Sequence, residues 1–328
     1  MNITLPEFVS ACFQNFNTLK TFSKLESTST TYAAGAVLLS TGRLIADPER
    51  LKECRSLLKE NVSCFSSFRS TASLLSVCAM YTSADPAQKL TRAKQNYTTL
   101  RKHFTDSVML PVAAFMLEDA VTPEQTAALA ERAVPLYKRM GKKHPFLTGG
   151  EDKVFALVLA SSHKSDDALI EETEEIYKLL PTSVDGNARQ SISHLYALSD
   201  EGVDTKCARL VNFVAALEKA GIKARRDYSF TEIALLAALN PDPIRICSDL
   251  SYVSSALAEK KDYQGLFGID TKTRTLHAAM ILAAWYAGSN PGTGFVPVAN
   301  AAASVVAVSA ALSAEESSSA AATVSTIC

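Results

Sequence analysis

The sequence has no excess of either charge, no closely paired cysteines and no motif that identifies a nucleotide fold. Its 33 Lys and Arg residues are balanced by 34 Asp and Glu residues, so the formal net charge is −1. Proteins that bind nucleic acid need a basic face, because the phosphate backbone supplies much of the affinity. The charge balance therefore predicts no nucleic-acid partner. The hydrophobic share of 47% is typical of a globular chain.

The seven cysteines contain no Cys-x-x-Cys pair, and their number is odd. This pattern argues against a disulfide framework and against a zinc knuckle. The first residues, MNITLPEFVSACFQNF, lack a basic segment followed by an apolar run, so we expect no secretory signal. We therefore expect reduced, mostly buried thiols in a cytoplasmic protein. A Cys–His nucleophile stays open, because such pairs are recognised by geometry rather than by spacing.

Motifs for phosphate and dinucleotide binding are also missing. No segment matches a Walker loop or a Gly-x-Gly-x-x-Gly fingerprint, and nothing indicates a cofactor, which stays unknown. No strand-length stretch alternates apolar and polar residues convincingly. The periodicity that is present is helical, and it predicts an all-α fold.

Helix-start signals recur along the chain at intervals of about 37 to 43 residues, the range of two-helix repeats. An Asp, Ser or Thr side chain can accept the unpaired N–H groups of a first helical turn, and Pro fits the first helical position. Asn290-Pro291 is a candidate for a seventh start, after a longer interval. The first six are Asp47-Pro48, Asp85-Pro86, Thr122-Pro123, Ser165-Asp166, Asp204-Thr205 and Asp242-Pro243.

Apolar stretches lie between these starts, and most are apolar nearly all round, as expected of helices buried on several sides. A buried helix followed by a half-exposed, charged one predicts stacked α-hairpins, either an α-solenoid or a right-handed superhelix. The spacing favours a HEAT-like array over tetratricopeptide repeats. Pro135 should kink or split its helix. The apolar stretches lie at 74–81, 110–117, 154–161, 192–199, 233–240 and 278–287.

We expect three segments in one domain. Residues 1–45 form an N-terminal helical cap that opens with a capping box between Thr4 and Glu7. Residues 46–291 form the α-hairpin array, and residues 292–328 form an Ala/Ser-rich C-terminal helix with a frayed tail.

The stretch 294–313 needs separate treatment because it carries no charge over about the length of a membrane span. Ala and Ser dominate it, Pro297 interrupts it and no basic residues flank it. A helix that closes the solenoid is therefore favoured, and a tail anchor is the alternative.

The stretch KHPFLTGGED at 143–152 joins a half-exposed helix to the next buried one. The Pro that follows His144 should end the first helix. Thr148 and Glu151 then match a capping box, in which the Thr oxygen accepts one N–H group and the Glu reaches back to another. Capping explains neither His144 nor Asp152.

Other polar residues have structural interpretations. Ser229 and Glu232 match a second capping box. His194 and His277 lie within apolar helices, where a hydrogen-bonded buried imidazole is commoner than a ligand-binding one. The acidic run at 171–175 is interpreted as a solvated outer face.

Equivalent loops of a solenoid line up along one edge, where polar residues often form a binding surface. Loops at 143–152, 180–190, 221–230 and 262–274 are expected there. Capping and turn formation account for much of their polarity, so structural corners compete with a ligand pocket. A metal shared by His144, Asp152 and His194 would need three segments to converge, and no metal site is predicted. The candidate ligand-binding residues are His144, Thr148, Asp152, Asn187, Gln190 and His194.

The run from His144 to Thr148, followed by Glu151-Asp152, resembles a motif of a bacterial family known as domain of unknown function 4003. Gly186-Asn187, Gln190 and Ser193-His194-Leu195 resemble its second recurring stretch. The resemblance covers most of the chain, to about Trp285, although Arg189 stands where the family pattern has an apolar residue. It implies a cytoplasmic, all-helical protein of comparable length and supplies no activity, cofactor or catalytic residue.

Two kinds of function compete. The favoured one is a binding or scaffold module that holds a protein or peptide on its stacked loops or outer groove, by analogy with other solenoids. The alternative is a small-ligand- or metal-binding protein, or an enzyme, that uses the polar edge around 144–152 and 185–194. A tail-anchored membrane protein is a third hypothesis.

Overall fold

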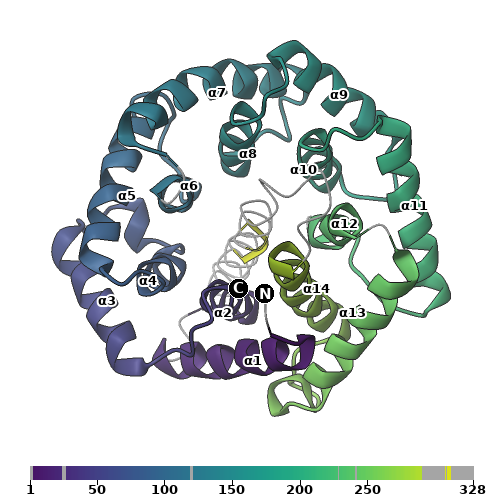
Figure 1. Cartoon of the computed structure of the whole chain (residues 1–328), viewed down its shortest axis with the longest axis horizontal. Helices are drawn as coiled ribbons and strands as arrows, with labels where there is room; N and C mark the ends of the chain where they lie inside the picture. Colours follow the sequence, from purple (N-terminus) through teal and green to yellow (C-terminus); the bar gives the residue numbers. More distant parts are fainter. Residues whose placement is uncertain are drawn as a thin grey trace, which may run out of the picture. The chain divides into compact units, whose positions relative to one another are not determined.

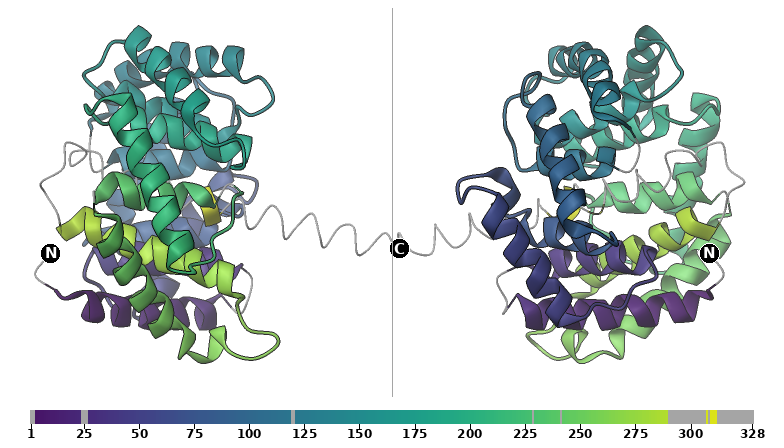
Figure 2. Two further views of the ribbon diagram at one scale, coloured as in Figure 1. Left: turned by 90° about the vertical axis from the view of Figure 1, so that its right-hand side faces the viewer. Right: turned by 60° about the vertical axis from the view of Figure 1, so that its left-hand side comes forward.

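The structure is a computed structural model that describes residues 3–23, 27–118, 121–227, 229–240, 242–289, 307 and 309–311. Every regular element in these ranges is a helix and none is a strand, which confirms the predicted all-α class (Figures 1 and 2). Contacts divide the chain into two compact units. The N-terminal unit contains residues 10–134 and the described residues from 307 on, and the C-terminal unit contains residues 3–9 and 135–289.

The helices alternate with short connections in both units. The first half of the chain contains α1 (Leu5–Phe22), α2 (Ser29–Thr41), α3 (Pro48–Asn61), η1 (Ser67–Arg69), α4 (Ser73–Tyr81), α5 (Pro86–Leu100) and α6 (Met109–Glu118). Then follow α7 (Pro123–Lys143), α8 (Gly150–Ala160), α9 (Asp166–Leu179), α10 (Gly186–Ala197), α11 (Val203–Lys219), α12 (Phe230–Leu239), α13 (Pro243–Ala258), η2 (Lys261–Tyr263) and α14 (Thr271–Ser289).

Local capping chemistry sets most helix starts. The Thr4–Glu7 box is confirmed, since the Thr4 N–H donates to the Glu7 carboxylate at 2.7 Å. A helix starts within one residue of the position predicted at Asp204-Thr205, but α11 begins at Val203 and its N-cap is Gly202 instead of Asp204. Asp204 lies instead in the first turn, where its charge is favourable next to the positive helix end. The side chains that cap α3, α5, α9 and α13 as predicted are Asp47, Asp85, Ser165 and Asp242.

All six apolar stretches fall on helices, the even-numbered α4 to α14, and three of them continue one or two residues past the helix end. These helices are mostly buried. In the C-terminal unit α8 packs against α10, α10 against α12, and α12 against α14. Helices α9, α11 and α13 contact one another in order and form a second layer over them (Figure 1). The N-terminal unit alternates in the same way, with α2, α4 and α6 in one row and α3 and α5 in the other.

Pro135 does not split its helix, because α7 runs unbroken from Pro123 to Lys143. Proline inside a helix costs about 3 kcal/mol through its lost hydrogen bond and its clash with the preceding turn. Ala133, Leu136 and Met140 offset this cost, since all three are buried at helical spacing along one face. The division between the two units falls directly before Pro135.

Loops of the C-terminal unit that precede even-numbered helices lie next to one another. A Cβ atom added to Gly186, at the start of α10, would lie 3.3 Å from the Leu147 side chain in the loop before α8. The Asp185 N–H donates to the Arg226 carbonyl at 2.8 Å, which joins the next two loops. Arg225 Nη2 is 3.4 Å from Asp270 Oδ2, just before α14. Four loops far apart in sequence thus form one continuous edge.

The chain beyond α14 is described only at 307 and 309–311, which are helical and buried. The remainder of the predicted closing helix at 294–313, and the candidate start at Asn290-Pro291, lie outside the described residues. Among the helices that the structure describes, none is both long enough and apolar enough to cross a membrane.

Candidate functional site

The segment that enters α8 is the centre of the predicted site, and its capping differs from the prediction. Gly149 is the N-cap residue, and its N–H donates to Asp152 Oδ2 at 2.7 Å. The capping box predicted for Thr148 and Glu151 is therefore wrong. The Thr148 hydroxyl donates to the His144 carbonyl at 3.0 Å, so it continues the turn that ends α7 instead of opening α8.

Four of the six candidate residues meet in a buried group that we call the α8–α10 cluster: Thr148, Asp152, Gln190 and His194. The Gln190 amide nitrogen donates to Asp152 Oδ1 at 3.1 Å and to Thr148 Oγ1 at 3.2 Å. His194 Nδ1 lies 3.3 Å from Asp152 Oδ1. The cluster fixes the first turn of α8 to the middle of α10.

Three of the four residues of the α8–α10 cluster are closed to solvent, and the fourth, Thr148, is half-buried. Asp152 and Gln190 are each 1% exposed and His194 is 2% exposed. Among the described residues, Gln190 Oε1 and His194 Nδ1 have no hydrogen-bond partner. The contact between His194 and Asp152 is close but lacks hydrogen-bond geometry. Such a group can orient helices as it stands, but a ligand could reach it only after α8 or α10 moved.

His144 lies beside this cluster but faces α9. Its Nε2 is 3.0 Å from Glu174 Oε1, and its ring centre is 4.2 Å from that of Tyr177. The imidazole therefore does not join Asp152 and His194. Within the described ranges, no group of three or more His, Cys, Asp and Glu side chains could hold a metal ion.

Asn187 does not reach the α8–α10 cluster either. It is exposed in the first turn of α10, where its backbone N–H donates to the capping Asp185 at 2.8 Å. The guanidinium carbon of Arg189 lies 4.5 Å from the centre of the Tyr177 ring. His144 and Arg189 therefore share one aromatic partner.

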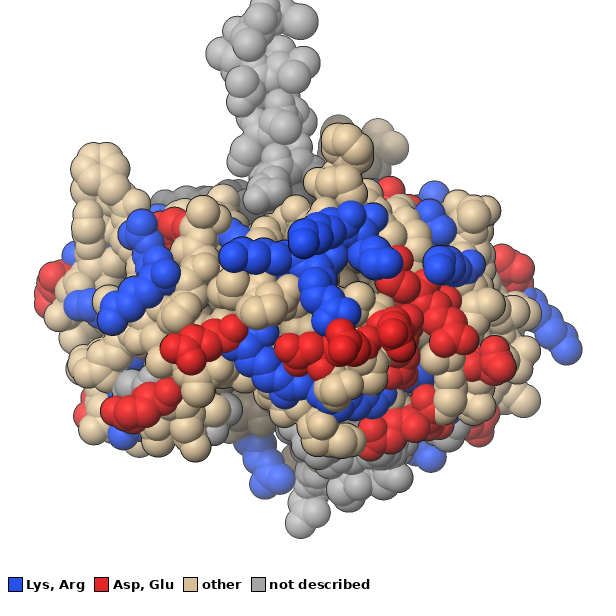
Figure 3. Space-filling view, turned by 90° about the horizontal axis from the view of Figure 1, so that it is seen from above, with Lys and Arg blue, Asp and Glu red and all other residues tan. Residues whose placement is uncertain are grey.

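A surface groove of about 1000 Å³ lies on the outer layer of the C-terminal unit, close to His144. Its lining includes Glu174, the partner of the His144 imidazole. Figure 3 looks onto the face that carries α7 and α9, and it shows acidic and basic side chains next to each other there. The lining of this α7–α9 groove comprises Arg139, Lys142, Lys143, Ile170, Glu171, Glu174, Glu175, Lys178, Leu179 and Asp204.

The acidic run at 171–175 is not a uniformly solvated face, which corrects the prediction. Glu171 and Glu175 are exposed, but the side chains of Glu172 and Glu174 are only 15% and 19% exposed. Glu172 pairs with Lys164, at 2.7 Å, and with Lys206. Neither Lys164 nor Lys206 is predicted in the sequence analysis as a member of a buried polar group.

A signal for Lys206 is present in the sequence. It precedes Leu210, Phe213 and Leu217 at helical spacing, so it lies on the apolar face of α11, and its side chain is 2% exposed. A lysine at such a position must find buried partners. Its ammonium group donates to the Tyr196 carbonyl at 2.8 Å, and burial lowers its pKa.

Glu232 is a second residue whose environment differs from the prediction. The expected box with Ser229 is wrong, since Ser229 makes no side-chain capping bond and neither Glu232 carboxylate oxygen has a hydrogen-bond partner within the described ranges. Glu232 is fully buried, and burial raises its pKa to about 8. The apolar helix FTEIALLAAL already places this carboxyl in the core.

The structural interpretation of His277 is confirmed. It is fully buried in α14, and its Nδ1 lies 2.9 Å from the Tyr263 hydroxyl. Burial lowers its pKa to about 3, so the imidazole is neutral at physiological pH.

Comparison with known proteins identifies the family. Residues 15–311 match the family described as protein of unknown function (DUF4003), and the chain belongs to that family. It is similar to the uncharacterized protein YeaA of Bacillus subtilis (strain 168), with 23% identity over 215 residues. That match covers 61% of this chain and spans 62% of the length of the relative. No solved structure matches the chain significantly.

Proposed function

We propose that this chain is a binding module that holds an extended segment of another protein in the α7–α9 groove. In this proposal the helix pairs form a HEAT-like α-solenoid, with a cap at 1–45, an array at 46–291 and a closing helix and tail at 292–328. The consecutive contacts from α8 to α14 and the continuous loop edge support this arrangement. Solenoids build long surfaces suited to extended partners.

The observation that carries the proposal is the chemistry of the groove lining. Four basic and four acidic side chains surround Leu179, whose side chain contributes an apolar surface that is 49% exposed. A small anion or cation would meet charges of its own sign as well as opposite ones. A peptide that carries both charges around an apolar residue can complement all three features.

The geometry also bears on the small-ligand alternative. The α8–α10 cluster is buried to 1–2% exposure at Asp152, Gln190 and His194, so a ligand there would have to open the helix packing. His144 and Asn187, the other two candidates, lie outside it. We therefore assign the cluster to orienting α8, the helix that connects α7 to α9 in the chain. If His144→Ala and Asp152→Ala abolished binding of a small molecule without weakening peptide binding, the alternative would be preferred.

We further propose a cytoplasmic location, supported by the state of the cysteines. Cys12, Cys54 and Cys207 are buried free thiols, and burial raises their pKa to about 12, 11 and 11 respectively. Thiols with such high pKa values are poorly reactive and suit a role in packing within a reducing compartment.

The experiment is a selection of random displayed peptides on the purified chain, followed by affinity measurement with labelled synthetic peptides. We expect the selected peptides to combine an apolar residue with charges of both signs. Lys142→Glu with Lys143→Glu should weaken their binding by about tenfold or more, because the peptide's acidic group then meets a like charge. Leu179→Asp should have a similar effect by removing the exposed apolar contact.

Lys219→Glu with Lys223→Glu is the matched control, since both lysines are exposed in the same unit and neither lines the groove. It changes the net charge equally and should leave affinity within about twofold. Failure to enrich any peptide, or an equal loss in the control, would disprove the proposal.

A further inference from the structure

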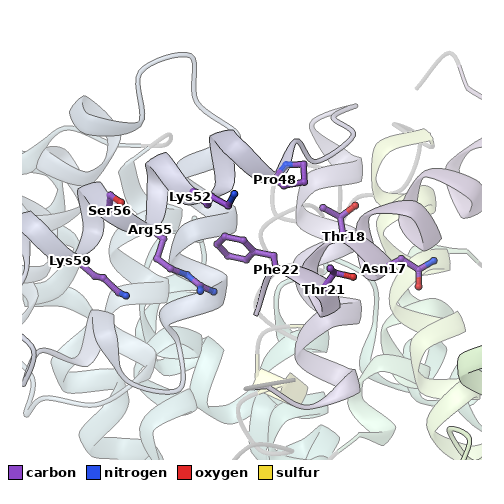
Figure 4. A pocket seen from close by; sticks show the side chains of 9 residues that line it. All are labelled: Asn17, Thr18, Thr21, Phe22, Pro48, Lys52, Arg55, Ser56 and Lys59. Atoms are coloured by element: carbon purple, nitrogen blue, oxygen red, sulfur yellow. The ribbon is translucent and has the colours of Figure 1, made fainter. Parts of the chain in front are cut away.

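A second groove, of about 770 Å³, lies between α1 and α3 in the N-terminal unit. It has the opposite character to the α7–α9 groove, because none of the described residues that line it is an Asp or a Glu. Figure 4 shows the α3 side chains facing those of α1, with Phe22 between Lys52 and Arg55. The lining of this α1–α3 groove comprises Asn17, Thr18, Thr21, Phe22, Pro48, Lys52, Arg55, Ser56 and Lys59.

Three cations follow one face of α3. Lys52, Arg55 and Lys59 are spaced by three and then four residues, so they lie above one another along the helix. With a rise of 1.5 Å per residue, they extend over roughly 10 Å. The acidic residues Glu53 and Glu60 of the same helix are not part of the lining. The groove is therefore a positively charged row about as long as a chain of two or three phosphate groups.

Arg55 is fixed in position at the centre of this row. Its guanidinium carbon lies 3.8 Å from the centre of the Phe22 ring, which holds the planar group by stacking. No carboxylate lies within ion-pair distance of Arg55 in the described part of the chain. In the described part of the chain Lys52 forms an ion pair with Glu49 alone, and the side chains of this pair are 62% and 73% exposed. An exposed pair of this kind is weak and is easily exchanged for a ligand.

The wall opposite the cations offers neutral polar groups. The Thr18 hydroxyl already donates to the Gln14 carbonyl at 3.1 Å. The Thr21 hydroxyl and the Asn17 amide lie on this wall, and the Ser56 hydroxyl lies beside the cations on α3. All three groups can donate to phosphate oxygens. A single carboxylate would use one cation, whereas a compact polyanion uses the whole row and the hydroxyls.

We propose that the α1–α3 groove binds a free di- or triphosphate group, with Arg55 contacting two oxygens and Lys52 and Lys59 neutralising the flanking phosphates. The planar guanidinium matches the spacing of phosphate oxygens, and its stacking on Phe22 reduces the entropy lost on binding. The site is separate from the α7–α9 groove, so it goes beyond the proposed peptide binding.

The test is calorimetric titration of the full chain with inorganic tripolyphosphate, at low ionic strength and without divalent metal. We expect binding of one equivalent, weakened by about tenfold in Arg55→Gln and lost in the triple variant Lys52→Gln, Arg55→Gln, Lys59→Gln. Phe22→Leu keeps all charges but removes the stacking partner, and it should weaken binding several-fold.

The charge-matched control is Lys138→Gln, Lys219→Gln, Lys223→Gln, three exposed lysines outside the groove. It should retain affinity within about twofold, since screening limits distant charges. An equal loss in this control, no binding by the wild type, or binding that Arg55→Gln leaves unchanged would overturn the proposal.

Two further measurements fix the site and the source of the phosphate. Hydrogen exchange with tripolyphosphate present should slow in α1 and α3, and slowing elsewhere alone would count against the groove. Cosedimentation with phosphatidylglycerol vesicles distinguishes a lipid headgroup. If vesicles bind through Arg55 while tripolyphosphate does not, the proposal of a free phosphate ligand is wrong.

Discussion

The C-terminal end and the middle of α10 bury polar groups in different ways. At the C-terminal end, Lys206 donates to the carbonyls of Tyr196 and Ser199, and Lys164 donates to those of Ala197 and Ser199. Glu172 pairs with both ammonium groups. In the middle of α10, the α8–α10 cluster is held by the neutral amide of Gln190, whose Oε1 has no hydrogen-bond partner among the described residues.

The difference indicates which of these two regions depends more on its polar groups for stability. A helix C-terminus exposes carbonyls that need donors, and two lysines with one shared carboxylate satisfy the carbonyls and their own charges. Removing one member leaves a poorly solvated charge behind. In the α8–α10 cluster, the N–H group of Gly149 at the start of α8 donates to Asp152, so the other members of the cluster contribute only single hydrogen bonds. The C-terminal end should therefore be the more sensitive to mutation.

Lys206→Met should give the largest loss of stability. The apolar stem is retained, but Glu172 loses one partner and the Tyr196 carbonyl loses its donor. Breaking a buried ion pair by removing one member costs about 3–5 kcal/mol. Urea unfolding measures this, with Lys219→Met, an exposed lysine of the same helix, as the control expected within about 0.5 kcal/mol. A loss of unfolding free energy below about 1 kcal/mol in Lys206→Met would mean that the C-terminal end of α10 is no more sensitive to mutation than its middle.

Glu232 extends the comparison to α12, which packs against α10, because it is a buried carboxyl that has no hydrogen-bond partner among the residues that the structure describes. Its pKa is about 8 in the folded chain, against 4.5 for an ordinary Glu. The folded state therefore holds a proton that the unfolded state releases, and stability falls as pH rises from about 4.5 through 8.

Between pH 5 and pH 8 this loss should amount to roughly 3 kcal/mol. Glu232→Gln removes the titration, so its stability should change less over that range than that of the wild type. The measurement is the urea midpoint at a series of pH values. Glu218→Gln, an exposed glutamate of α11, serves as the control and should keep the wild-type slope. Parallel slopes for wild type and Glu232→Gln would show that Glu232 is ionised.

Gln190→Ala should have an intermediate effect. It removes the amide that bonds to Asp152 and Thr148, and it leaves a buried carboxylate with one fewer donor. A buried acceptor left without its partner costs about 1–3 kcal/mol. Asn187→Ala, exposed one turn earlier on the same helix, should be nearly neutral in the same unfolding assay. A loss in Gln190→Ala as large as that in Lys206→Met would contradict the expectation that the C-terminal end of α10 is the more sensitive region.

Helix positions could be predicted from the sequence because their causes are local. Asp47, Asp85 and Asp242 cap helices within three residues of themselves, and apolar runs mark the buried helices wherever they pack. The capping prediction for α8 is wrong because another hydrogen-bond partner lies closer to the predicted capping side chain. The hydroxyl of Thr148 bonds to the preceding turn, and this leaves Gly149 and Asp152 to cap α8.

The candidate site was predictable only in part, because its contacts are not local. Lining up the loops placed 144–152 beside 185–194, and the bonds from Gln190 to Asp152 and Thr148 agree with that. Sequence patterns could not show that Asp152 and His194 are closed to solvent, nor that His144 faces Glu174. Whether a polar side chain is shielded from solvent depends on the helices that pack against it. Those helices lie about 30 to 40 positions away in the sequence.

Thr148→Val should give the smallest of these effects. Valine keeps the shape of the side chain but loses the hydroxyl that donates to the His144 carbonyl and accepts from Gln190. Gln190 keeps its bond to Asp152, so the expected cost is about 1 kcal/mol, that of one hydrogen bond. Thr148→Ser retains the hydroxyl and should cost less in the same urea titration. If Thr148→Val were as damaging as Gln190→Ala, the bond between Gln190 and Thr148, rather than that between Gln190 and Asp152, would hold α8 to α10.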